Sequence, residues 1–244
     1  MQSRSVQQEL ERALSAVAAH PVAVTAAGRT DAGVHALMQV AHFDSPSQRS
    51  TRAWTLGVNT ELPAEITVLW ATAVPGGFHA RYSALSRTYV YQIANQPCRP
   101  ALLRGRVCWI RRSLDSDVMH VAAQDLVGEH DFSSFRAAEC QSASAIRRIS
   151  HIAVGRCDAT VVITVRANAF LHHMVRNIAG ALIAVGTGSR PAGWIAELLA
   201  ARDRSKGGVT APPQGLYLAQ VDYPDEFGIP PPGRAGACGD PTAV

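Results

Sequence analysis

A single carboxylate in a glycine-bounded loop is the group in this sequence best suited to chemistry. The loop runs from Gly28 to Ala36 and reads Gly-Arg-Thr-Asp-Ala-Gly-Val-His-Ala, with Arg29 two residues before Asp31. Because glycine adopts backbone conformations that other residues resist, Gly28 and Gly33 allow a tight loop with rigidly held side chains. A carboxylate presented in this way beside a cation suits a nucleophile or a base. The alternative is an Asx-turn at a strand end, in which Asp31 caps its own loop and Arg29 faces solvent.

Two apolar segments must position this loop. Val22 to Ala27 leads into the loop and Leu37 to Phe43 leaves it, which predicts a strand on each side. Before the first strand, Ser5 and Gln8 form a possible capping box, and apolar residues recur at helical spacing as far as Val17. We therefore expect a helix, then a strand, then the loop.

The order of the remaining elements predicts an α+β protein with two halves of similar plan. Residues 1–97 form the first predicted domain and residues 98–224 the second, while residues 225–244 have too few large apolar side chains to fold and are expected to be disordered. Residues 128–135 are expected to form a helix end and a turn. The other expected elements are helices at 52–58, 116–127 and 170–185, a helix from Pro191 to residue 200, and strands at 66–74, 87–95, 146–154, 160–165 and 216–221.

Composition permits a polyanionic partner without demanding one. The net charge is +4 and the isoelectric point is about 9.0. Arginine greatly outnumbers lysine, which suits phosphate contact, although high-GC coding bias gives the same excess. Arginine and lysine cluster at 99–106, 111–112, 147–148 and 202–206.

Cysteine usage and hydropathy exclude several protein classes. The five cysteines are odd in number and lack a Cys-x-x-Cys spacing, which argues against a disulfide framework and a structural zinc site. No apolar segment is long enough to span a bilayer, and the start of the chain leads into no signal-peptide core. We therefore expect a soluble cytoplasmic protein without a membrane partner.

Histidines raise the alternative of a metal site. His172 and His173 are adjacent, and His35, His42 and Asp44 offer further ligands. If both adjacent histidines lie on the helix expected at 170–185, their side chains point about 100° apart and do not easily bind one ion. The sequence therefore predicts no metal site.

The loop and six further segments resemble one known family. Gly28 to Ala36 is similar to the catalytic-loop signature of the TruA family of tRNA pseudouridine synthases, a specific signal of nine contiguous residues. The likeness covers the chain from about residue 5 to about residue 224. It continues in order through Ser5–Leu14, His79–Ala84, Arg87–Tyr91, Gly128–Phe135, Ala167–Asn177 and Gly215–Leu218.

The resemblance implies a fold and an activity. The fold would be two ferredoxin-like or RRM-like α+β halves, whose antiparallel sheets pack side by side around an active-site cleft. The activity would be isomerisation of uridine to pseudouridine at positions 38–40 of the tRNA anticodon stem and loop, without metal or organic cofactor. The resemblance also implies a homodimer that binds tRNA.

The resemblance further implies roles for five side chains. Asp31 would be the nucleophile, paired with Arg176, and Arg29 would help to displace the target nucleotide. Tyr89 would stack on the uracil and assist removal of the C5 proton, while Leu216 would pack against the ring. Taken alone, Tyr89 and Leu216 are typical of a core, and Arg176 of a structural ion pair or a solvated side chain.

One departure from the family pattern keeps alternatives open. Family members normally begin with a strand and a Gly-Trp-Gln segment before the first helix, whereas here the chain starts almost at that helix. We expect this to leave an unpaired edge in the first sheet. A catalytically silent RNA-binding protein of the same fold is therefore the main alternative, and a metal hydrolase that uses the histidines is a third interpretation.

Overall fold

A computed structural model describes residues 4–230 of the chain. Contacts within it divide these residues into two compact units, formed by residues 4–29, 39–84 and 223–230 and by residues 30–38 and 85–222. Helices and mainly antiparallel strands occur together, which confirms the predicted α+β class. The predicted domain bounds at 97/98 and the side-by-side packing of two halves stay predictions.

The first unit is built around helix α1, Val6–Ala18. The predicted capping box is confirmed, since the Ser5 hydroxyl accepts from the Gln8 backbone N–H and the Gln8 side chain accepts from the Ser5 N–H. One face of α1 is buried in a small core. That core consists of Ala13, Leu14, Ala18, Val22, Val24 and Val58.

Strands are short in this unit. β1, Thr25–Ala26, and β3, Ala41–His42, form an antiparallel pair of two residues each, shorter than the predicted apolar strands. The helix expected at 52–58 is a π-helical segment, Ala53–Gly57, that continues into α2, Val58–Glu61. The strand predicted at 66–74 is wrong. The backbone of Val68 bonds to the side chain of Asn59 instead of to a neighbouring strand.

The C-terminal end of the first unit is ordered by aromatic contacts. Asp225–Phe227 forms a 3₁₀ turn, and the Phe227 ring lies 5.2 Å from that of Phe78. The disorder predicted from residue 225 is therefore wrong for this turn, because Phe227 supplies an apolar contact. The rest of that prediction, at residues 231–244, lies outside the described residues.

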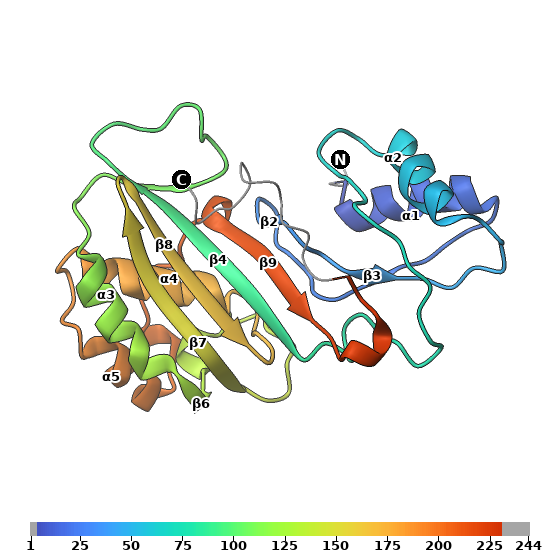
Figure 1. The fold of residues 1–244 in the computed structure, drawn as a ribbon. Coiled ribbons are helices and arrows are strands. Elements are labelled where there is room, and N and C mark those ends of the chain that lie inside the picture. Colours follow the sequence, from blue (N-terminus) through green and yellow to red (C-terminus); the bar gives the residue numbers. More distant parts are fainter. Residues whose placement is uncertain (1–3, 231–244) are drawn as a thin grey trace. The chain divides into compact units, whose positions relative to one another are not determined.

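The second unit carries a seven-stranded sheet (Figure 1). The strands along its path are β2 (His35–Ala36), β9 (Leu216–Asp222), β4 (Ser86–Asn95), β8 (Thr160–Ala167), β7 (Ile146–Cys157) and β6 (Gly128–Asp131). Off this path, β5, Cys108–Ile110, pairs with β4. Neighbouring strands are antiparallel except in the β2–β9 and β4–β5 pairs, which are parallel.

The strand β6 corrects the expectation of a helix end and turn over residues 128–135. Gly128 has a positive φ of 111°, a conformation that suits glycine, and the next residues pair with β7. A turn does follow, as the 3₁₀ segment Ser133–Phe135. The prediction is thus wrong for the strand and right for the turn.

Three helices cover one face of this sheet (Figure 1). They are α3 (Ser116–Ala123), α4 (Met174–Gly186) and α5 (Trp194–Ala201). On β8, alternate residues Val161, Ile163 and Val165 are fully buried in the core beneath them. Among the described residues, no helix is long and apolar enough to cross a membrane.

Candidate active site

The loop that carries Asp31 belongs to the second unit and joins its sheet. β2 pairs with β9 through two residues, and the backbone N–H of Leu37 donates to the carbonyl of Leu218 at 2.9 Å. The His35 ring also stacks on Tyr217, with ring centroids 4.7 Å apart. These contacts fix the C-terminal side of the loop against a long central strand.

A glycine sets the bend directly after Asp31. Gly33 has a φ of +82°, and a Cβ at this position would lie 3.2 Å from the Cγ of Pro213. The backbone N–H of Val34 donates to the carbonyl of Asp31 at 3.0 Å, which closes a tight turn. The predicted need for glycine is confirmed at Gly33.

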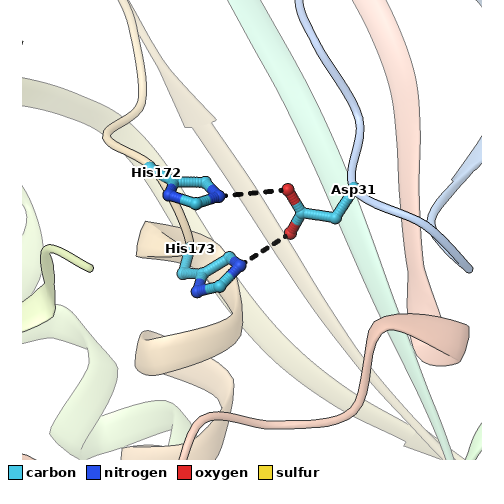
Figure 2. A group of neighbouring side chains, drawn as sticks. All are labelled: Asp31, His172 and His173. Carbon is cyan, nitrogen blue, oxygen red and sulfur yellow. Dashed lines mark ion pairs between the residues drawn. The ribbon is translucent and has the colours of Figure 1, made fainter. Parts of the chain in front are cut away.

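Three side-chain nitrogens from a segment far away in the sequence lie against the Asp31 carboxylate, and the one from Arg176 donates a hydrogen bond to it. Arg176 Nη1 lies 2.9 Å from Oδ2, His173 Nε2 lies 3.1 Å from Oδ2, and His172 Nε2 lies 3.3 Å from Oδ1. Figure 2 shows both histidine rings directed at the carboxylate. The Asp31 side chain remains 29% exposed. Among residues 4–230, the side chains that contact this carboxylate lie outside its own loop, which disfavours the Asx-turn interpretation.

Contacts with Ala211 fix the orientation of the Arg176 side chain independently of Asp31. Its Nε donates to the carbonyl of Ala211 at 2.9 Å, and the N–H of Ala211 donates to the Arg176 carbonyl at 3.1 Å. The side chain is only 14% exposed. The guanidinium thus holds a loop with one nitrogen and the carboxylate with another, as a planar fork can.

The two histidines reach one carboxylate because neither lies within the helix. The helix expected from residue 170 begins at Met174, and His173 precedes it in a left-handed conformation, with φ 59° and ψ 5°. The rings of His172 and His173 therefore lie side by side, with centroids 4.0 Å apart and an interplanar angle of 37°. The argument that adjacent histidines diverge by a helical step does not apply here.

Sequence comparison places these residues in a known family. The sequence model of a family described as tRNA pseudouridine synthase matches residues 1–83 and 122–224, which include the loop and both histidines.

The chain belongs to the tRNA pseudouridine synthase family.

Three relatives, each named tRNA pseudouridine synthase A, show how far this similarity extends. The chain is 57% identical over 226 residues to the protein of Methylococcus capsulatus, covering 93% of this chain and 83% of the relative. It is 56% identical over 227 residues to that of Coxiella burnetii, covering 93% and 87%. It is 55% identical over 226 residues to that of Aeromonas hydrophila, covering 93% and 84%.

Burial sets the charge of His173 and Tyr89 in this member of the tRNA pseudouridine synthase family. Burial lowers the pKa of His173, and the neighbouring His172 and Arg176 side chains act in the same direction, while Asp31 opposes the shift. Burial also raises the pKa of Tyr89 to about 12, and Asp31 contributes in the same direction. The Tyr89 phenol is therefore neutral at neutral pH, which makes it a poor base.

The other predicted residues occupy different surroundings. Tyr89 lies on β4 and packs edge-to-face against Phe170, with centroids 5.0 Å apart. Leu216 is 6% exposed and lies in the core opposite Tyr91, so its contact with uracil stays a prediction. Arg29 is exposed and belongs to the first unit. The structure thus brings Asp31 and Arg176 together.

A metal is the remaining alternative for the histidines. Ligand atoms of Asp31, His172 and His173 lie within 4.8 Å of one another, a group that could hold an ion. Arg176 already occupies Oδ2 and would repel a divalent cation there. His35 instead bonds to the Gly105 carbonyl, and the ring of His42 accepts from the N–H of Ala80. The arrangement therefore favours a hydrogen-bonded carboxylate over a metal ligand.

Proposed function

We propose that this protein isomerises uridine to pseudouridine in tRNA and that Asp31 is its nucleophile. In this reaction the bond from ribose C1′ to uracil N1 breaks, a bond from C1′ to C5 forms, C5 loses a proton and N1 gains one. The atoms balance without an oxidant or a reductant. A carboxylate can form the transient covalent bond that keeps the two fragments together while the base turns.

The pairing of Asp31 with Arg176 is the observation that carries the proposal. The two residues are 145 positions apart, yet their side chains meet at 2.9 Å. The carboxylate nevertheless keeps 29% of its surface exposed. A charge that is neutralised, oriented and still accessible suits a nucleophile, whereas binding to a phosphate-rich ligand gains nothing from a carboxylate.

The proposed substrate is the anticodon stem and loop, at positions 38–40. A paired base must leave its stack to meet the carboxylate, and Tyr89 with Phe170 offers an aromatic surface beside which it can lie. Arg99 and Arg104, which are exposed, suit contact with the RNA backbone. Arg204 serves the protein instead, because it bonds to Asn177, Gly208 and Thr210.

We also propose that the protein is a cytoplasmic homodimer, since recognition of a stem by shape needs a larger surface than one small site. Light scattering after gel filtration is expected to give twice the chain mass. A monomer at micromolar concentration would contradict the dimer and leave the activity untouched.

The test is release of tritium from tRNA labelled at uridine C5. The protein is expected to release tritium in the presence of EDTA. Asp31→Asn should release none, because an amide of the same shape lacks the charge, while its melting temperature stays close to that of the wild type. Asp44→Asn, an exposed aspartate of the first unit, is the matched control and should keep full activity.

Two other outcomes would favour the alternatives. Wild-type protein that is folded and binds tRNA but releases no tritium would support the silent RNA-binding protein. Activity that EDTA abolishes and added zinc restores would support a metal enzyme.

A further inference from the structure

The two oxygens of the Asp31 carboxylate are not equivalent. Oδ2 faces both Arg176 Nη1 at 2.9 Å and His173 Nε2 at 3.1 Å. Among the described residues, Oδ1 faces His172 Nε2 alone, at 3.3 Å. An ionised carboxylate offers about two lone-pair sites on each oxygen. Oδ2 thus accepts the Arg176 hydrogen bond and has a second nitrogen close by, whereas Oδ1 has one nitrogen near it and keeps a lone pair for reaction.

Exposure follows the same division. The side chains that face Oδ2 are the more enclosed ones, with Arg176 14% exposed and His173 29% exposed. His172, which faces Oδ1, is 37% exposed and makes the longest of the three contacts. The His172 ring is therefore the easiest of the three side chains to displace from the carboxylate.

Backbone conformation holds His173 in its place. A left-handed conformation is unfavourable for histidine, and its φ of 59° is retained directly before α4, where the carbonyl of His173 accepts from the N–H of Asn177. This conformation directs the Nε2 of His173 at Asp31 (Figure 2). Strain of this kind is common where a side chain must be positioned for function.

The charge of His173 supports a donor role. Burial keeps its pKa below the ordinary value, while Asp31 and Glu139 oppose that shift and His172 and Arg176 add to it. At neutral pH the ring is therefore neutral and carries one N–H. With that proton on Nε2, His173 orients the carboxylate without adding a second full positive charge to the one from Arg176.

We infer that Oδ1 is the oxygen of Asp31 that attacks the nucleotide, and that His173 is a positioning residue that anchors Oδ2 together with Arg176. The inference rests on the proposed function, in which Asp31 is the nucleophile. A lone pair of Oδ1 forms a bond to ribose C1′ as the bond from C1′ to uracil N1 breaks. That new bond breaks when C5 of the turned base bonds to C1′, after which C5 loses its proton and N1 gains one, so the carboxylate is regenerated. His172 gives up its contact with Oδ1 as the nucleotide enters.

The experiment compares alanine and glutamine at both histidines in single-turnover tritium release. His173→Ala should lower the rate at saturating protein by about 100-fold, as expected when a reacting group loses its alignment. The protein concentration for half-saturation with tRNA should hardly change. His173→Gln should recover most of the rate, since its amide N–H can replace Nε2–H. His172→Ala should lose about tenfold or less, because its contact is given up in any case.

The control is His151→Ala, an exposed histidine on β7. It should match the wild type in rate and melting temperature. If His173→Ala fails to fold, His173→Gln decides, because it keeps the donor and nearly the same volume. A merely structural role would lower the melting temperature of the alanine variant without separating the rate from the affinity.

Several results would overturn the inference. A folded His173→Ala variant with the wild-type rate would show that His173 does not anchor Oδ2. Equal losses of rate in His173→Gln and His173→Ala would show that the role of His173 is not that of a hydrogen-bond donor. A larger loss at His172 than at His173 would reverse the assignment of the two oxygens. If the wild type releases tritium and Asp31→Asn does not, the proposed function stands in each of these cases.

Discussion

Arg176 offers the sharpest test of how the nucleophile is held. Replacing it by methionine removes the 2.9 Å contact to Oδ2 and the 2.9 Å bond to the Ala211 carbonyl, while much of the side-chain volume remains. Replacing it by lysine keeps the charge, but a single ammonium group cannot hold both acceptors in the geometry of the guanidinium fork.

The magnitude follows from the burial of the pair. Exposed ion pairs contribute about 0–1 kcal/mol, and breaking a buried pair costs about 3–5 kcal/mol. With Arg176 14% exposed and Asp31 29% exposed, the pair lies between these limits, at about 2 kcal/mol. If this loss falls wholly on the reacting state, the rate drops about 30-fold. Arg176→Lys should lose less than Arg176→Met.

The assay is single-turnover tritium release at saturating protein, so that weaker tRNA binding does not enter the rate. Arg148→Met, which changes an exposed arginine on β7, is the matched control and should keep the wild-type rate under these conditions. An Arg176→Met protein that folds and stays within threefold of the wild type would refute the reasoning, because the carboxylate would then need no cation.

Three further changes test other parts of the structure. Gly33→Ala should cost about 1–2 kcal/mol of stability, because its φ is +82° and the added methyl group meets Pro213; chemical denaturation measures this, and an unchanged midpoint would contradict it. Tyr89→Phe should leave the shape of the pH–rate profile unchanged up to about pH 10, since the pKa of Tyr89 is about 12; loss of an alkaline limb would assign that limb to this phenol. Burial lowers the pKa values of His42 and His173 in the folded protein. Just below the ordinary histidine pKa, the unfolded chain therefore binds more protons than the folded protein, and the free energy of unfolding should fall as the pH drops through about 6.5. Melting temperatures at about pH 5 and pH 7.5 measure this effect, and His42→Gln should reduce the difference.

Short sequence patterns predicted the elements that depend on interactions between residues close together in the chain. The capping box of Ser5 and Gln8 begins α1 as expected, because both halves of that motif lie within four residues. The alternation of Tyr89, Tyr91 and Ile93 identified β4 by its period of two, although Val90 and Ala94 on the other face of the strand are buried as well. The pairing of Asp31 with Arg176 followed from the family resemblance, as no local pattern joins residues so distant.

Elements that depend on distant partners were predicted less well. Residues 66–74 have strand-like composition, but the side chain of Asn59 takes the hydrogen bonds that a neighbouring strand would have supplied. The histidine pair was missed because apolar residues after Phe170 suggested an earlier helix start. The left-handed turn at His173 shifts that start to Met174. The two adjacent histidines were the only sequence signal for this pair. That signal was dismissed because adjacent side chains on a helix point about 100° apart.

The short β2–β9 pairing determines which part of this protein unfolds first. The Asp31 loop is attached to the sheet by two residue pairs between β2 and β9 and by the adjacent backbone hydrogen bonds to Leu218. The β4–β8 and β7–β8 pairs are much longer. Subglobal openings start where few bonds must be broken. Mild denaturant should therefore release the Asp31 loop from β9 before the rest of the sheet unfolds. Catalytic turnover should then be lost while circular dichroism still reports an intact sheet.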